Sequence, residues 1–357
     1  MPRPDRFLRA CRGEPVDATP VWFMRQAGRY MAAYQALRQR YDLLTIVKTP
    51  ELAAEVTLQP IQAFDVDAAI IFSDLLPPLE GMGVPLRFVK GKGPVLDDPI
   101  RSADDVDALA TPSAEEALSF TLEAIRLLRP ELDSLGIPLI GFAGAPFTLA
   151  SYAIEGGGSR KFAKTKAFLY TEPDAWRRLM QKLVAVSADF LLAQARAGAQ
   201  ALQVFDSWAG VVSREEYRRF VLPHTRDLLR RVAAAGVPVI SFTTGTGAYV
   251  EIIAEAGGDV LGVDAQLPLD EVRRRVGSRP LQGNLEPIVL QAPWETLRSE
   301  TDAVLAAAPA TGHIFNVGHG LVPETPPDAV ARLTDYVHAV TSERLSGALV
   351  GEANARR

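Results

Sequence analysis

The chain has 357 residues, of which 48% are hydrophobic and 23% are charged, values typical of a globular protein and not of a disordered one. Its 38 Lys and Arg residues against 43 Asp and Glu residues give a formal net charge of −5, which argues against a protein that coats nucleic acid. The one cysteine, Cys11, excludes an intrachain disulfide and a zinc site built from a cysteine cluster.

The N-terminal segment "MPRPDRFLRACRGE" lacks the long apolar core of a signal peptide. No run of about 18 apolar residues indicates a membrane span. We therefore expect a cytoplasmic protein with no membrane attachment.

Eight short apolar runs predict strands, each bounded by polar or glycine-rich turns. The runs are continuous in apolar character and do not alternate, which is typical of parallel strands covered on both faces. They lie at about 20–24, 68–72, 138–142, 201–205, 238–242, 259–263, 279–283 and 313–317.

Helical patterns fill the gaps between these runs. The clearest spans 173–197, where apolar residues recur at spacings of three and four, Pro173 suits a first-turn position and Gly198 is placed to end the helix. Further helices are predicted at 49–64 and 325–340, and a kinked or split helix at 214–235, which Pro223 interrupts.

Strands that alternate with helices predict an α/β protein, a single (β/α)8 TIM-type barrel domain over residues 1–357. A doubly wound open sheet is the alternative, weakened because no GxGxxG motif follows the first strand. Residues 77–135 are too long for one crossover and predict an insertion after the second strand, a β-hairpin at 85–98 followed by a helix at about 114–130. No repeat or linker divides the chain, and the tail at about 346–357 is expected to fray.

Unusual polar residues follow directly after the predicted strands. In a barrel, the carboxyl ends of the strands carry the active site, so these residues are expected to meet there. The first strand leads to Arg25 and Arg29, the second to Asp74, the third to Tyr152, the fourth to Ser207 and the eighth to His319.

Each of these residues also has a plain structural interpretation. Arg25 and Arg29 could be solvated charges on an exposed helix, and Asp74 could cap the next helix. Tyr152 and Ser207 are weak signals by themselves, and a lone loop histidine such as His319 is more often structural than catalytic. Asp206 could orient its neighbours Ser207 or Trp208 or cap the next helix, and we assign it a structural role. The "TGTG" at 244–247 is assigned to a tight turn after the fifth strand.

The known nucleophile arrangements fit this sequence poorly. There is no GxSxG motif, and Cys11 lies before the first strand. Glu286 is the only strand-end acid that could pair with Asp74, and its Glu-Pro context indicates a turn. A site rich in arginine with one principal acid suits a substrate with several anionic groups. The single carboxylate would stabilise positive charge that develops during the reaction.

Long motifs in this chain resemble those of the uroporphyrinogen decarboxylase family. They are "PVWFMRQAGRYMAAY", "IIFSDLLPPLEGMG", "GFAGAPFTLASYAIEGGGS", "FDSWAG", "QGNLEP" and "HIFNVGHGLVPETPPD", in order over residues 4–342. The resemblance implies a (β/α)8 barrel, a cytoplasmic homodimer and an enzyme without cofactor or metal. It further implies the decarboxylation of the four acetate side chains of uroporphyrinogen III to methyl groups, giving coproporphyrinogen III in porphyrin and heme biosynthesis.

The same resemblance assigns roles to individual positions. Asp74 and Arg25 are the expected catalytic residues, with Asp74 accepting hydrogen bonds from pyrrole N–H groups and stabilising the cationic ring. The residues expected to bind the substrate are Arg25, Gln26, Ala27, Gly28, Arg29, Asp74, Tyr152, Ser207 and His319.

Two rival functions remain at this stage. A cobalamin- or thiol-linked methyltransferase on a related barrel would need zinc ligands from His and Cys, which a chain with only Cys11 provides poorly. A porphyrinogen carrier without enzymatic activity would need the arginines but not Asp74.

Overall fold

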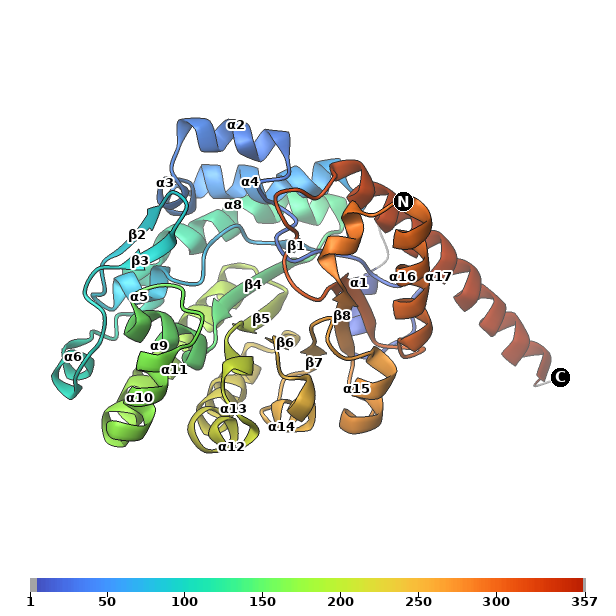
Figure 1. The fold of residues 1–357 in the computed structure, drawn as a ribbon. Coiled ribbons are helices and arrows are strands. Elements are labelled where there is room, and N and C mark those ends of the chain that lie inside the picture. The colour runs from blue at the N-terminus through green and yellow to red at the C-terminus, as the bar shows by residue number, and fades with distance from the viewer. Residues whose placement is uncertain (1–4, 356–357) are drawn as a thin grey trace.

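The computed structural model describes residues 5–355, with side chains described as far as residue 343. Its main element is a curled sheet of seven parallel strands in the order β1-β4-β5-β6-β7-β8-β9, with helices along its outer side (Figure 1). These strands confirm seven of the eight predicted runs. They are β1 (Ala69–Ile70), β4 (Leu139–Gly144), β5 (Ala201–Asp206), β6 (Val239–Thr243), β7 (Val260–Gly262), β8 (Leu281–Leu285) and β9 (His313–Val317).

The strand expected at 20–24 is reduced to a single parallel bridge between Val21 and Phe315 of β9. Side chains take the places of neighbouring ladder bonds, because Val21 N donates to Asp67 Oδ2 at 2.8 Å and Met24 N donates to Asn316 Oδ1 at 3.0 Å. The carbonyl of Val21 accepts from Asp67 N at 2.7 Å, just before β1. The segment thus contacts both edges of the sheet without forming a regular strand.

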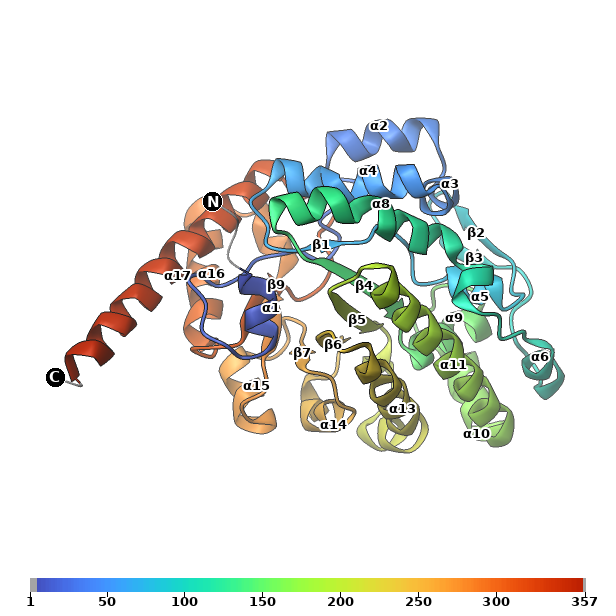
Figure 2. The same ribbon diagram turned by 180° about the vertical axis from the view of Figure 1, so that it is seen from behind.

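The helices alternate with the strands and cover the outer side of the sheet in both views (Figures 1 and 2). Before β1 lie α1 (Arg6–Cys11), α2 (Ala32–Arg40), α3 (Leu43–Lys48) and α4 (Pro50–Ala63), and before β4 lie α5 (Pro77–Gly81), α6 (Ala103–Ala108), α7 (Ala114–Ala117) and α8 (Ser119–Leu135). The later helices are α9 (Pro146–Glu155), α10 (Ala163–Thr171), α11 (Pro173–Ala197), α12 (Arg214–Glu216), α13 (Leu222–Val232), α14 (Val250–Glu255), α15 (Leu269–Val276), α16 (Trp294–Ala307) and α17 (Pro327–Ala355). Short helical turns are η1 (Ala209–Val211), η2 (Tyr217–Val221), η3 (Ala233–Ala235), η4 (Gly247–Tyr249) and η5 (Pro287–Gln291).

Two helix predictions follow local sequence rules closely. Helix α11 begins at Pro173 and ends before Gly198, whose φ of 125° is one that glycine adopts readily, so the prediction for 173–197 is confirmed. The pattern at 214–235 is split into α12, a π-helical turn at η2, and α13, with Pro223 in the first turn of α13. The tail that we expect to fray, 346–357, lies outside the residues whose side chains are described. At 356–357 the backbone is not described either.

A separate antiparallel pair, β2 (Leu86–Val89) and β3 (Gly93–Leu96), lies between β1 and β4 in the chain. This hairpin packs against the loop that follows α9. Leu96 N donates to Gly156 O at 3.1 Å, and Val95 forms an antiparallel bridge with Gly157. The hairpin is therefore held beside the chain that leaves β4.

A second, smaller core fills the inside of the curled sheet. Phe7, Ala10 and Cys11 of α1 pack there with residues near the beginnings of the strands, among them Ala201 and Val260. Helix α1 lies across this end of the sheet, beside β9 (Figure 2). Because α1 covers the amino ends of the strands, the opposite end is the one left for a site.

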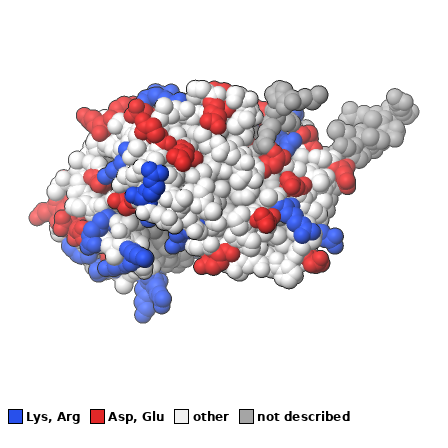
Figure 3. Space-filling view, turned by 90° about the horizontal axis from the view of Figure 1, so that it is seen from above, with Lys and Arg blue, Asp and Glu red and all other residues white. Residues whose placement is uncertain are grey.

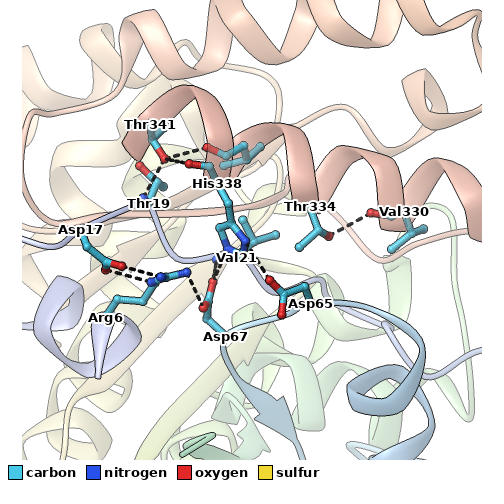
Figure 4. A network of polar contacts seen from close by, with 11 residues as sticks. Arg6, Asp17, Thr19, Val21, Asp65, Asp67, Val330, Thr334, His338 and Thr341 are labelled. Atoms are coloured by element: carbon cyan, nitrogen blue, oxygen red, sulfur yellow. Dashed lines mark hydrogen bonds and ion pairs between the residues drawn. The ribbon is translucent and has the colours of Figure 1, made fainter. Parts of the chain in front are cut away.

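Polar contacts tie the N-terminal segment to α17 (Figure 4). The carboxylate of Asp67, only 3% exposed, contacts Arg6 Nη1 at 3.2 Å and His338 Nε2 at 2.7 Å, and Arg6 also pairs with Asp17. A buried carboxylate needs such partners, and here they fix the segment that precedes Arg25.

The surface seen from above carries both signs of charge, with acidic and basic side chains interspersed among uncharged stretches (Figure 3). Ion pairs between exposed side chains, such as Arg87 with Asp97 and Arg178 with Asp107, occur on the surface of the protein. Pairs of this kind contribute little to stability, typically about 0–1 kcal/mol.

Candidate active site

One cavity of about 370 Å³ opens at the carboxyl ends of the strands. Seven of the nine residues predicted for the site line it, although they come from five different loops or helices. They are Arg25, Gln26, Ala27, Asp74, Tyr152, Ser207 and His319. The fold thus brings polar residues that follow different strands to one place, as expected from the sequence.

Arg25 enters this cavity from a tight turn, not from a helix, since α2 begins only at Ala32. Its φ of 61° lies in the left-handed region, which is uncommon for a residue other than glycine. Its side chain lies against Gly320, where an added Cβ would be 2.3 Å from Arg25 Cδ. Among the described residues no carboxylate lies within ion-pair distance of Arg25, so its charge is available to a ligand.

Asp74 is the carboxylate of this cavity. Burial raises its pKa, and the backbone N–H of Leu76 and the positive charge of Arg25 oppose that rise. Its Oδ1 accepts from Leu76 N at 3.0 Å, but Leu76 itself is the N-cap of α5, so Asp74 does not cap that helix. A half-buried acid close enough to an arginine to feel its charge is an arrangement that often marks a functional site.

His319 lies at the edge of the cavity. Its Nδ1 accepts from Gly320 N at 2.7 Å, so the neutral ring carries its proton on Nε2. Burial and the nearby charge of Arg25 lower the pKa of the ring, with Glu286 and Asp264 acting in the opposite direction. At neutral pH the ring is therefore an uncharged Nε2–H donor.

The remaining residues of the "RQAGR" stretch differ in their surroundings. Gln26 is fully buried, and its amide binds Phe23 N and Ala68 O, so this side chain ties the loop to the strand beside it. Gly28 makes the tight turn, where an added Cβ would lie 3.0 Å from Arg25 O. Gly28 and Arg29 do not line the cavity, and Arg29 is exposed to solvent.

Aromatic side chains that were not among the predicted site residues also line the cavity. Phe142, Phe205 and Phe242 share the cavity wall, and the Phe205 ring meets the other two edge-on at centroid distances of 5.5 and 5.7 Å. Trp208 packs against Tyr152 at 5.7 Å. The signal was present, since each phenylalanine belongs to a predicted strand, but the apolar run does not say which side of the sheet a ring occupies.

A second cavity of about 450 Å³ adjoins the first and shares Ser207, Trp208 and His319 with it. Its other walls include Asp264 and Glu286, so its charge is opposite to that of the Arg25 side. Because they share these three residues, the two cavities adjoin at the carboxyl ends of the strands.

No group of three or more His, Cys, Asp or Glu side chains that could hold a metal ion occurs in the described part of the chain. Cys11 is buried in α1, at the other end of the sheet, and burial raises the pKa of its thiol. Within the same residues, no helix has the length and apolar character needed to cross a bilayer.

Comparison with known protein sequences identifies the family of this chain. The sequence model of the uroporphyrinogen decarboxylase family matches residues 2–340. The chain belongs to the uroporphyrinogen decarboxylase family. A uroporphyrinogen decarboxylase of Sorangium cellulosum is 53% identical over 345 residues, covering 96% of this chain and 98% of the relative. One of Thermus thermophilus is 52% identical over 339 residues, covering 95% and 98%.

Solved structures with similar folds are more distant in sequence. A methyltransferase from Methanosarcina mazei has a TM-score of 0.77 at 20% identity, over 94% of this chain and 97% of that one. A B12-independent methionine synthase from a Shewanella species has a TM-score of 0.57 at 10% identity, over 85% and 89%. At these identities the likeness is one of fold alone, whereas the uroporphyrinogen decarboxylase family membership rests on the whole sequence.

Proposed function

We propose that this protein decarboxylates the four acetate side chains of uroporphyrinogen III to methyl groups, giving coproporphyrinogen III in porphyrin and heme biosynthesis. The observation that carries the proposal is one cavity that combines the carboxylate of Asp74 with Arg25, which has no ion-pair partner among the described residues, in a chain of the uroporphyrinogen decarboxylase family. The enzyme is accordingly a carboxy-lyase.

The chemistry needs an electron sink and a counter-charge. A pyrrole ring that takes a proton on carbon becomes cationic and can accept the electron pair of the breaking C–C bond as carbon dioxide leaves. The exocyclic carbon then takes a proton and the ring loses one, so that a proton replaces carbon dioxide overall. We assign Asp74 to accept hydrogen bonds from the pyrrole N–H groups and to stabilise the positive ring, an electrostatic contribution that is largest out of water.

Arg25 is assigned to hold the carboxylate of the reacting acetate beside Asp74. A guanidinium retains its proton too firmly to serve well as a general acid at neutral pH, so positioning is its principal role. His319, as a neutral Nε2–H donor, together with Tyr152 and Ser207 supplies hydrogen bonds to the substrate. Gln26, Ala27 and Gly28 are assigned to substrate contacts by the family resemblance; Gln26 and Ala27 line the cavity, whereas Gly28 lies outside its wall.

Further features belong to this proposal on the strength of the family resemblance. They are a closed (β/α)8 barrel as one domain over residues 1–357, the β2–β3 hairpin as an insertion in it, a homodimer and a cytoplasmic location. The contacts of Val21 with Phe315 and Asp67 support closure, because they join the two edges of the sheet.

The direct test is an anaerobic assay of the purified protein with uroporphyrinogen III, with carboxylate loss followed by chromatography. We expect hepta- to tetracarboxylate products in sequence. Binding without any loss of carboxylates would instead favour a porphyrinogen carrier.

Removal of metal ions should leave this activity unchanged. The described residues offer no metal-binding cluster, and the proposed chemistry uses Asp74 and the ring itself. The same assay after EDTA treatment and desalting, with and without added Zn²⁺, checks this expectation. Activity that EDTA abolishes and Zn²⁺ restores would contradict it.

Arg29→Ala should raise KM about three- to tenfold and flatten the dependence of kcat/KM on salt, because an exposed cation near the cavity attracts a polyanion through a screened interaction. Initial rates at several salt concentrations measure both effects. Arg298→Ala, on the exposed side of α16, is the matched control. If both variants behave alike, Arg29 is ordinary surface charge.

A further inference from the structure

Asp206, the last residue of β5, is a buried acid that the proposed chemistry does not use. The residue is 2% exposed, and burial raises the pKa of its carboxyl to about 6. Its Oδ1 accepts from Thr148 Oγ1 at 2.6 Å, whereas its Oδ2 has no hydrogen-bond partner within the described chain. Burying a carboxylate with an unpaired oxygen is unfavourable, so a purely structural role is a poor explanation for an acid at this position.

Thr148 connects this acid to the wall of the active site. Its single hydroxyl donates to Asp206 and at the same time accepts from Trp208 N at 3.2 Å. On the other side of the same loop, Thr244 Oγ1 donates to Ser207 O at 2.7 Å. Ser207 and Trp208 are thus held from two directions, and both residues line both cavities.

We propose that Asp206 and Thr148 form a positioning pair that sets Ser207 and Trp208 in the wall shared by the two cavities. This inference rests on the proposed decarboxylase function. Trp208 in turn packs against Tyr152 and, at 5.0 Å, against Phe162. A shift of the Trp208 backbone would therefore move a predicted substrate-binding hydroxyl on α9 as well as Ser207.

The acid matters because an ionised carboxylate only accepts hydrogen bonds. It fixes the direction of the Thr148 O–H bond and leaves the hydroxyl lone pair for Trp208 N–H. A protonated Asp206 can itself donate, which allows the hydroxyl to turn and release Trp208. The titratable groups that face Asp206 are Tyr217 of η2 and Tyr249 of η4, and burial raises the pKa of both, so they remain neutral.

Thr148→Val keeps the shape of the side chain and removes both hydrogen bonds. We expect kcat/KM to fall about tenfold, since small displacements in an active site have effects of this order, and Thr148→Ser to stay within about twofold of the wild type. In a Ser207→Ala background the effect of Thr148→Val should shrink, because coupled residues are not additive. Unfolding by urea, measured on each variant, separates stability from activity.

A second variant, Asp206→Asn, tests the positioning pair even if Thr148→Val does not fold. The ratio of wild-type to Asp206→Asn kcat/KM should be largest at neutral pH and fall towards one as pH drops through about 6, where Asp206 becomes protonated. A ratio independent of pH, or a loss of stability in Thr148→Val with unchanged kcat/KM, would overturn the positioning role.

A change in the surroundings of Trp208 can also be measured without an activity assay. Tryptophan fluorescence, with Trp208→Phe used to subtract the other three tryptophans, should change in Thr148→Val and not in Thr148→Ser. An inactive wild type would refute the proposed function, whereas unchanged Trp208 emission in Thr148→Val would refute the positioning pair.

Discussion

Asp74→Asn should lower kcat by at least about 10²-fold while the protein remains folded. The substitution keeps the size of the side chain and removes its negative charge from the cavity that Arg25 shares. The cationic pyrrole would then lose its principal counter-charge, and groups of this kind contribute factors of about 10²–10³ to turnover. Single-turnover decarboxylation of uroporphyrinogen III measures the loss, and turnover close to that of the wild type would remove Asp74 from the mechanism.

The stability of Asp74→Asn is an independent check on the site. Burial raises the pKa of Asp74 in the folded protein, so at neutral pH its ionised form destabilises the fold. Asparagine removes that cost, and the variant should be as stable as the wild type or more stable at pH 7. As pH falls through the folded and then the unfolded pKa, the wild-type carboxyl becomes protonated in both states and the difference should vanish. Urea unfolding at several pH values tests the sign, with the exposed Asp98→Asn as control.

Much of the fold could be predicted because its signals are local. A buried parallel strand is a short apolar run, and α11 carries its own start and stop in Pro173 and Gly198. The site followed from one rule, that polar residues after parallel strands meet at one end of the sheet, which brought Asp74 and His319 into the same cavity. Neither step required knowledge of a contact between distant residues.

The features that the sequence does not reveal share a physical cause. The strand expected at 20–24 lost its regular ladder because Asp67 and Asn316 supply side-chain acceptors from far along the chain. The sequence also does not reveal that Asp206 accepts a hydrogen bond from Thr148, because the two residues are 58 positions apart. Long-range hydrogen bonds of this kind leave no periodic pattern, so apolar spacing and turn residues do not reveal them.

Gly320→Ala should lower kcat/KM by about 10- to 10²-fold with little change in the fold. An alanine Cβ at this position would lie 2.3 Å from Arg25 Cδ and 2.7 Å from Arg25 Cγ, so the arginine side chain has to leave its place. The backbone of Arg25, at a φ of 61°, sits in a tight turn and has little freedom to follow. Displacing a carboxylate-binding group by an ångström or more has effects of this size on turnover. Steady-state kinetics with uroporphyrinogen III measures the loss.

A double variant with Arg25→Ala shows whether the loss of kcat/KM in Gly320→Ala is caused by the displacement of Arg25. If Gly320→Ala acts by moving Arg25, then adding it to Arg25→Ala should cause little further loss, because the two substitutions remove the same interaction. Gly158→Ala is the matched control, since an added Cβ there meets nothing within 4 Å. Additive losses in the double variant would mean that Gly320 contributes to turnover through something other than Arg25. Wild-type kinetics in Gly320→Ala would mean that the guanidinium can bind substrate from a different position, and that its contact with Gly320 does not define the site.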